Sequence, residues 1–76
     1  MRLRESPPGE PFRVSSIRLS APAALRLSEM GIRVGTLAHV TQRAAFGGRV
    51  VAVAGSRFAL DGTTAGLIDV EVAVSS

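Results

Sequence analysis

The sequence predicts a small, mainly β domain: a strongly bent barrel of about five short strands with one short α-helix. Three observations lead to this prediction. The chain has 76 residues, which is room for one hydrophobic core and not two. Short apolar or alternating segments are separated by glycine turns, and only one segment has the composition of a helix. Five such strands are too few for a sandwich, whereas a bent barrel hides the sheet edges.

The first predicted strand covers residues 12–17. Phe12 and Val14 alternate with polar residues, which is the period of a half-buried strand. Ile17 is out of phase with them, so we expect a bulge or the end of the strand near Ser16.

The predicted helix lies between Ser20 and Gly31. Ser20 is a typical helix N-cap, Pro22 suits the first turn, and strong helix formers follow over residues 23–30. Gly31 fits the left-handed position that ends many helices.

The second half of the sequence predicts four more strands and one helical turn. The strands are expected over residues 36–43, 49–54, 57–60 and 67–74, and the helical turn after Asp61. In the first of these strands Ala38 and Val40 face the core and Leu37 is left exposed. In the last one the alternation places Ile68, Val70, Val72 and Val74 inward, against Asp69 and Glu71 outward.

The chain is expected to form a single domain over residues 1–76, with its core in residues 8–74. Residues 1–7 are expected to be an N-terminal extension, because Pro7-Pro8-Gly9 favours an extended segment and a turn. Only Leu3 of this segment could reach the core.

The composition excludes several classes of protein. The absence of cysteine excludes a disulfide framework and thiolate zinc sites, and the single histidine excludes a multi-histidine site. We therefore expect no metal site and no cofactor.

No apolar run approaches the roughly 20 residues that span a bilayer, and no signal peptide is visible. We expect a cytoplasmic protein without membrane insertion.

The net charge of +3 comes from nine arginines scattered along the chain. A basic module that binds nucleic acid is one reading of this charge, but such a module would want aromatic stacking platforms, and the chain has three phenylalanines. Nucleic acid is therefore the less favoured partner.

An enzyme is not expected. His39 is the only imidazole and lies in mid-strand with an outward phase, and Asp69 and Glu71 lie on one strand face without a predicted cleft. The glycine pairs lack the Lys and Ser/Thr of a phosphate-binding loop. What remains is an interaction surface at the helix exit and at the hairpin tip around Phe46.

The segment Leu27-Ser28-Glu29-Met30-Gly31-Ile32-Arg33-Val34-Gly35-Thr36, followed by Phe46-Gly47-Gly48, resembles the FeoA family of ferrous iron transport proteins. Pro8-Gly9-Glu10 is similar to the family's opening, and the resemblance covers residues 8–72. It implies an SH3-like barrel that acts in the cytoplasm as an accessory of FeoB, the ferrous iron transporter with a cytosolic GTP-binding domain. FeoB would recruit it to the inner face of the membrane. No small-molecule substrate is implied.

The same barrel resembles the C-terminal domain of iron-dependent repressors, so a detached regulatory domain of that type is an alternative. Self-association through a strand edge is another. For partner binding we expect two groups of residues, the helix exit and the hairpin: Leu27, Met30, Ile32 and Gly35, and Arg43, Phe46 and Arg49. Leu27, Met30 and Ile32 also have the character of core residues, whereas no structural need for Arg43 or Arg49 is visible in the sequence.

Overall fold

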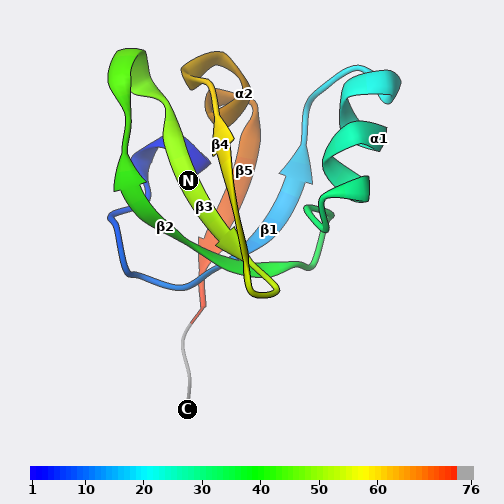
Figure 1. Cartoon of the computed structure of the whole chain (residues 1–76). Helices are drawn as coiled ribbons and strands as arrows, with labels where there is room; N and C mark the ends of the chain where they lie inside the picture. Colours follow the sequence, from blue (N-terminus) through cyan, green and yellow to red (C-terminus); the bar gives the residue numbers. More distant parts are fainter. Residues whose placement is uncertain (74–76) are drawn as a thin grey trace.

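A computed structural model describes residues 1–73 as a five-stranded antiparallel sheet bent around one core, with one longer helix beside it (Figure 1). In chain order the elements are the 3-10 turn η1 (Leu3–Glu5), β1 (Phe12–Ile17), α1 (Ala21–Glu29), β2 (Leu37–Arg43), the 3-10 turn η2 (Ala45–Gly47), β3 (Arg49–Val53), β4 (Ser56–Leu60), the short helix α2 (Gly62–Gly66) and β5 (Ile68–Val72). The mainly β class, the five strands and the single longer helix are confirmed.

The strands follow the order β4-β3-β2-β1-β5 in the sheet. β1 pairs with both β2 and β5, and its register against β5 shifts between Val14 and Ser16. This is the bulge that the sequence predicts. β5 pairs with β1 on both sides of this bulge, whereas β2 pairs only with Phe12 and Arg13, and the bent sheet curls into a half-closed barrel (Figure 1).

Local sequence signals explain both ends of α1. The Ser20 hydroxyl accepts a hydrogen bond from the Ala23 N–H at 3.4 Å, and Pro22 occupies the first turn. Gly31 has φ 92°, and beyond it the Ile32 N–H donates to the Leu27 carbonyl at 2.9 Å. This tight exit turns the chain towards β2.

Every strand and both helices contribute to the core, together with η1. The buried apolar residues are Leu3, Phe12, Val14, Leu27, Ile32, Ala38, Val40, Val51, Val53, Leu60, Ala65, Ile68 and Val70. Ala38 and Val40 alternate with half-buried His39 and Thr41 and with exposed Leu37, as expected.

The N-terminal segment differs from the expected extension. Residues 3–5 form η1, and Leu3 is only 1% exposed in the middle of the core. The Met1 ammonium donates to the Val70 carbonyl at 2.9 Å, while the Val70 N–H donates to the Met1 carbonyl. Residues 1–7 are therefore part of the domain, held by backbone bonds along β5.

Val72 is a second departure. The strand phase predicts that it faces inward, but its side chain is 46% exposed. It is the last residue of β5 and pairs with Phe12, the first residue of β1. Val74, which we also expect to face inward, lies outside the described residues.

Candidate functional site

The tip of the β2–β3 hairpin presents Phe46 to solvent. The ring is fully exposed, and its backbone has φ 55°, a left-handed conformation that costs a non-glycine residue about 1 to 2 kcal/mol. The turn is closed by two bonds, from the Ala44 N–H to the Gly48 carbonyl at 2.9 Å and from the Gly48 N–H to the Ala45 carbonyl at 3.0 Å. The structure thus holds an aromatic ring outward in an unfavourable conformation.

Helix α2 braces this tip from behind. A Cβ on Gly62 would collide with the carbonyl oxygen of Phe46 and would lie 3.1 Å from the carbonyl carbon of Gly47. Only glycine permits so close a packing of the two segments. The position of Phe46 is therefore set by a non-local contact as well as by its own turn.

Two arginines face each other at the base of the hairpin, and they differ in role. Arg43 and Arg49 are paired in register. Arg49 is half-buried, and its guanidinium donates to the Gly48 carbonyl at 2.8 Å and to the Arg4 carbonyl at 2.6 Å. It ties η1 to the hairpin, which is a structural role that the sequence did not indicate. Arg43 is exposed, and the one ion pair within residues 1–73 lies elsewhere.

The helix exit also separates into core and surface. Leu27 and Ile32 are buried, whereas Met30 is half-buried against the core. Gly35 is exposed with φ 94°; its N–H donates to the Val14 carbonyl at 2.7 Å, and its carbonyl accepts from Arg13 at 2.8 Å. Only Met30 and Gly35 of this predicted group are accessible to a partner.

A groove of about 280 Å³ separates α1 from β4 and α2. The wall on the α1 side contains Leu19, Ala23, Arg26, Leu27 and Met30, and the other wall contains Ala59, Leu60, Asp61 and Thr64. The two walls are about thirty residues apart in sequence. Sequence reasoning therefore missed the groove, although two predicted site residues, Leu27 and Met30, lie in its lining.

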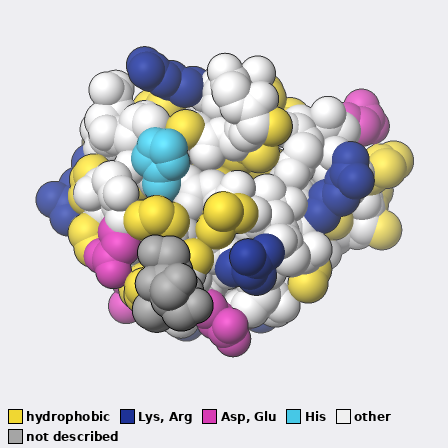
Figure 2. Space-filling model, turned by 90° about the horizontal axis from the view of Figure 1, so that it is seen from below, with side chains coloured by type: hydrophobic (Ala, Val, Ile, Leu, Met, Phe, Trp, Pro, Cys, Tyr) yellow, Lys and Arg dark blue, Asp and Glu magenta, His cyan; other side chains and the backbone are white. Residues whose placement is uncertain are grey.

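A second hollow of about 350 Å³ lies on the lower face, and its lining includes His39 together with Pro11, Leu37, Ala52 and Ala54. Figure 2 shows the histidine among apolar side chains on this face and the arginines standing apart from one another. A continuous basic surface is not seen there.

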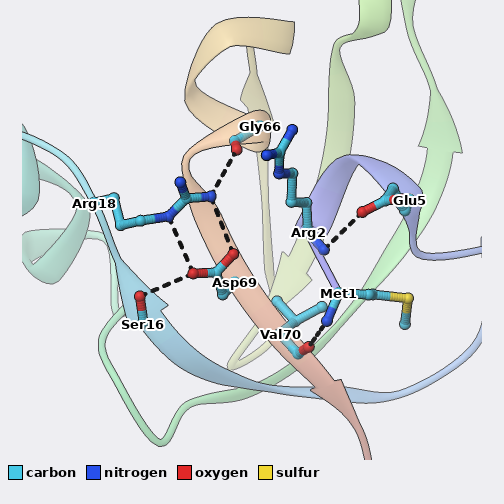
Figure 3. Close-up of polar contacts among 8 residues, drawn as sticks. All are labelled: Met1, Arg2, Glu5, Ser16, Arg18, Gly66, Asp69 and Val70. Carbon is cyan, nitrogen blue, oxygen red and sulfur yellow. Dashed lines mark hydrogen bonds and ion pairs between the residues drawn. The ribbon is translucent and has the colours of Figure 1, made fainter.

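An ion pair with its neighbouring hydrogen bonds joins the end of β1 to β5 and α2. The Arg18 guanidinium donates to both carboxylate oxygens of Asp69 at 3.1 Å and to the Gly66 carbonyl at 3.3 Å, and the Ser16 hydroxyl donates to Asp69 at 3.0 Å (Figure 3). The hydrogen bond from Ser16, then the contact with Arg18, lowers the pKa of Asp69.

Asp61 serves the fold in a similar way. Its carboxylate accepts a hydrogen bond from the Thr64 N–H at 2.7 Å and caps α2, and hydrogen bonding to Thr64 lowers the pKa of Asp61.

Within residues 1–73 there is no group of three His, Cys, Asp or Glu side chains placed to hold a metal ion. Nor does any helix of this part of the chain have the length and hydropathy to span a membrane.

The family model of the FeoA domain matches residues 1–72. No curated protein matches the chain.

Three solved structures show the same fold. An iron(II) transport protein A from Clostridium thermocellum is 30% identical with a TM-score of 0.85, and the match covers 95% of this chain and 45% of that protein. This chain thus spans less than half the length of that relative. An iron uptake regulatory protein, FeoA, is 30% identical with a TM-score of 0.82, over 92% of this chain and 93% of the other.

The third is FeoA from Stenotrophomonas maltophilia complexed with zinc, which is described as a procaryotic SH3 domain protein. It is 32% identical with a TM-score of 0.75, over 93% of this chain and 89% of that one. The expected SH3-like barrel is thereby confirmed.

Proposed function

The chain belongs to the FeoA family, and we propose that it is a cytoplasmic accessory protein of ferrous iron uptake that binds the cytosolic side of the transporter FeoB. The names of two relatives support a role in ferrous iron transport. The Clostridium thermocellum protein is named for iron(II) transport, and the Stenotrophomonas maltophilia protein is described as a candidate activating factor of ferrous iron transport.

The observation that carries the proposal is the exposed ring of Phe46. A phenylalanine that buries nothing within its own domain, yet is held in a left-handed turn braced by Gly62, has no structural reason to be aromatic. Backbone strain of this kind gathers at functional sites, and exposed aromatic anchors dominate protein interfaces. Phe46 therefore inserts into a pocket of the partner.

Arg43 extends the same surface. Its side chain is exposed beside the tip, and it can meet an acidic group of FeoB. Arg49 supports the surface from below rather than touching the partner, because its guanidinium is occupied by two backbone carbonyls. At the other end of the domain, Met30 and Gly35 are the accessible residues of the helix exit.

Iron uptake in cells that lack the native protein tests this function. Cells carrying Phe46→Ala or Arg43→Glu should take up ferrous iron more slowly than wild-type cells at equal protein levels. Leu25→Ala is the matched control for Phe46, since Leu25 is an exposed apolar residue outside both surfaces. Arg2→Glu is the control for Arg43. Wild-type uptake with both Phe46→Ala and Arg43→Glu would refute the hairpin surface.

A further inference from the structure

Strand β4 is an edge strand, and the backbone geometry shows which of its groups face outward. The turn between β3 and β4 has two residues, Ala54 and Gly55, both left-handed with φ 49° and 84°. In such a hairpin the closing pair, Val53 and Ser56, is hydrogen-bonded, and bonded pairs then alternate along the strands.

It follows that Phe58 and Leu60 bond to β3, while the N–H and C=O groups of Arg57 and Ala59 point away from the sheet. Beyond the β3–β4 ladder, no backbone bond within residues 1–73 involves either residue.

The opposite edge of the sheet is treated differently. Along β5, Met1 exchanges two backbone bonds with Val70, and Arg2 forms an antiparallel bridge with Asp69. The chain thus covers one edge with its own N-terminal residues and leaves the β4 edge open. Exposed edge strands are usually blocked against pairing or used for binding, because they otherwise pair with other chains.

The groove between α1 and β4 reaches this strand at its last two residues, Ala59 and Leu60. Neighbouring residues of a strand point to opposite faces, yet both Ala59 and Leu60 line the groove. The groove therefore borders the C-terminal end of β4, and Arg57 lies two residues before Ala59 on the same open edge. Its far wall offers the apolar side chains of Ala23, Leu27 and Met30.

Two arginines and one aspartate lie at or beside the groove. Arg26 lines it and Arg57 stands exposed on β4, and within the described chain neither forms an ion pair. Asp61 is the acidic residue of the lining, and its carboxylate is engaged by the Thr64 N–H.

We propose that an extended segment of FeoB, with apolar residues alternating with acidic ones, adds to the sheet as a sixth strand between β4 and α1. This inference rests on the proposed function and names the form of the bound segment. The backbone of Arg57 and Ala59 supplies the hydrogen bonds. Apolar side chains of the added strand contact Ala23 and Met30 on α1, and its acidic side chains meet Arg26 on α1 and Arg57 on β4.

Amide hydrogen exchange tests this directly. The 15N-labelled chain is measured alone and with the soluble cytosolic region of FeoB, and then with overlapping synthetic peptides that cover that region. We expect the amides of Arg57 and Ala59 to exchange rapidly in the free chain and slowly in the complex. Those of Phe58 and Leu60, already bonded to β3, are the internal reference.

Two variants test, by their affinity for FeoB, the hydrogen bond that the Ala59 N–H donates to the added strand. Ala59→Pro removes only the outward N–H, and edge strands accept proline there. It should weaken binding of FeoB by about tenfold or more, whereas Ala59→Ser, which keeps the donor, should stay within about twofold. Should Ala59→Pro fail to fold, the exchange of the wild-type amides decides the question alone. Arg26→Glu with Arg57→Glu should also weaken binding, with Arg2→Glu as the control.

The outcomes separate this inference from the proposed function. If FeoB binds while the exchange of Arg57 and Ala59 is unchanged, the added strand is refuted and the proposed function stands. If FeoB does not bind at all, both fail. If the two amides become protected in the chain alone as its concentration rises, a second copy occupies the edge and the proposal is overturned.

Discussion

Replacing Phe46 with glycine separates what this residue does for folding from what it does for binding. Glycine adopts the left-handed conformation freely, which relieves about 1 to 2 kcal/mol of strain. It also raises the entropy of the unfolded chain, at a cost of roughly 0.5 to 1 kcal/mol. No packing is lost, because the ring is fully exposed. Phe46→Gly should therefore be at least as stable as the wild type, by up to about 1.5 kcal/mol.

The same change removes the proposed anchor. Truncating an aromatic hot spot costs about 2 kcal/mol or more of binding free energy, which is about thirtyfold in Kd. Thermal unfolding measures the first effect, since 1 kcal/mol moves the Tm of a domain this small by roughly 4 to 8 °C. Calorimetric titration with the cytosolic region of FeoB measures the second.

Phe46→Ala is the control, because alanine keeps the strained conformation while it removes the ring. It should lose as much affinity as Phe46→Gly without the gain in stability. If both variants lost more than about 1 kcal/mol of stability, the ring would pack on its own domain, contrary to the structure. An unchanged Kd in both would remove Phe46 from the interface.

Three further predictions concern the fold. Leu3→Ala should destabilise the domain by about 2 to 5 kcal/mol in urea unfolding, because Leu3 is a core residue. The control Leu25→Ala, at an exposed residue, should change stability by less than about 0.5 kcal/mol. Equal effects of the two variants would place residues 1–7 outside the core. Gly62→Ala should lower the free energy of unfolding by about 1 to 3 kcal/mol, because the new Cβ collides with the hairpin tip. Gly66→Ala should be tolerated, because a Cβ there would lie 3.8 Å from the Arg4 side chain. An unchanged stability of Gly62→Ala would contradict the close packing of α2 against the hairpin tip. Because folding lowers the pKa of Asp69, its contribution to stability is present above the ordinary value of 3.8 and is lost as the pH falls through the lower folded pKa. Urea unfolding measured down to about pH 2 should show a shallower acid loss in Asp69→Asn than in the wild type, and identical losses would refute this linkage.

Elements that depend on neighbouring residues could be read from the sequence. The cap at Ser20, the left-handed Gly31 and the bulge before Ser16 all follow from local composition and phase, and the structure has each of them. The alternation of Ala38 and Val40 likewise fixes the core face of β2.

What the sequence did not reveal depends on contacts between distant segments. Leu3 is buried because the N-terminal residues pair with β5, and Arg49 is structural because Arg4 offers it a carbonyl. Val72 keeps the phase of Ile68 and Val70, but it is the last residue of β5 and remains exposed. The groove at β4 requires α1 to stand opposite a strand some thirty residues away. None of these features follows from the hydrophobic periodicity of a single segment.

An NMR titration of the labelled chain with the cytosolic region of FeoB from the same source, with and without guanine nucleotide and with an unrelated RNA as the control, tests the central claim most directly. The proposed function predicts localised shifts around residues 27–35 or 43–49 with FeoB and none with RNA. A spectrum that FeoB leaves unchanged, while RNA shifts the arginines in a salt-dependent way, would contradict it and favour a nucleic-acid-binding module.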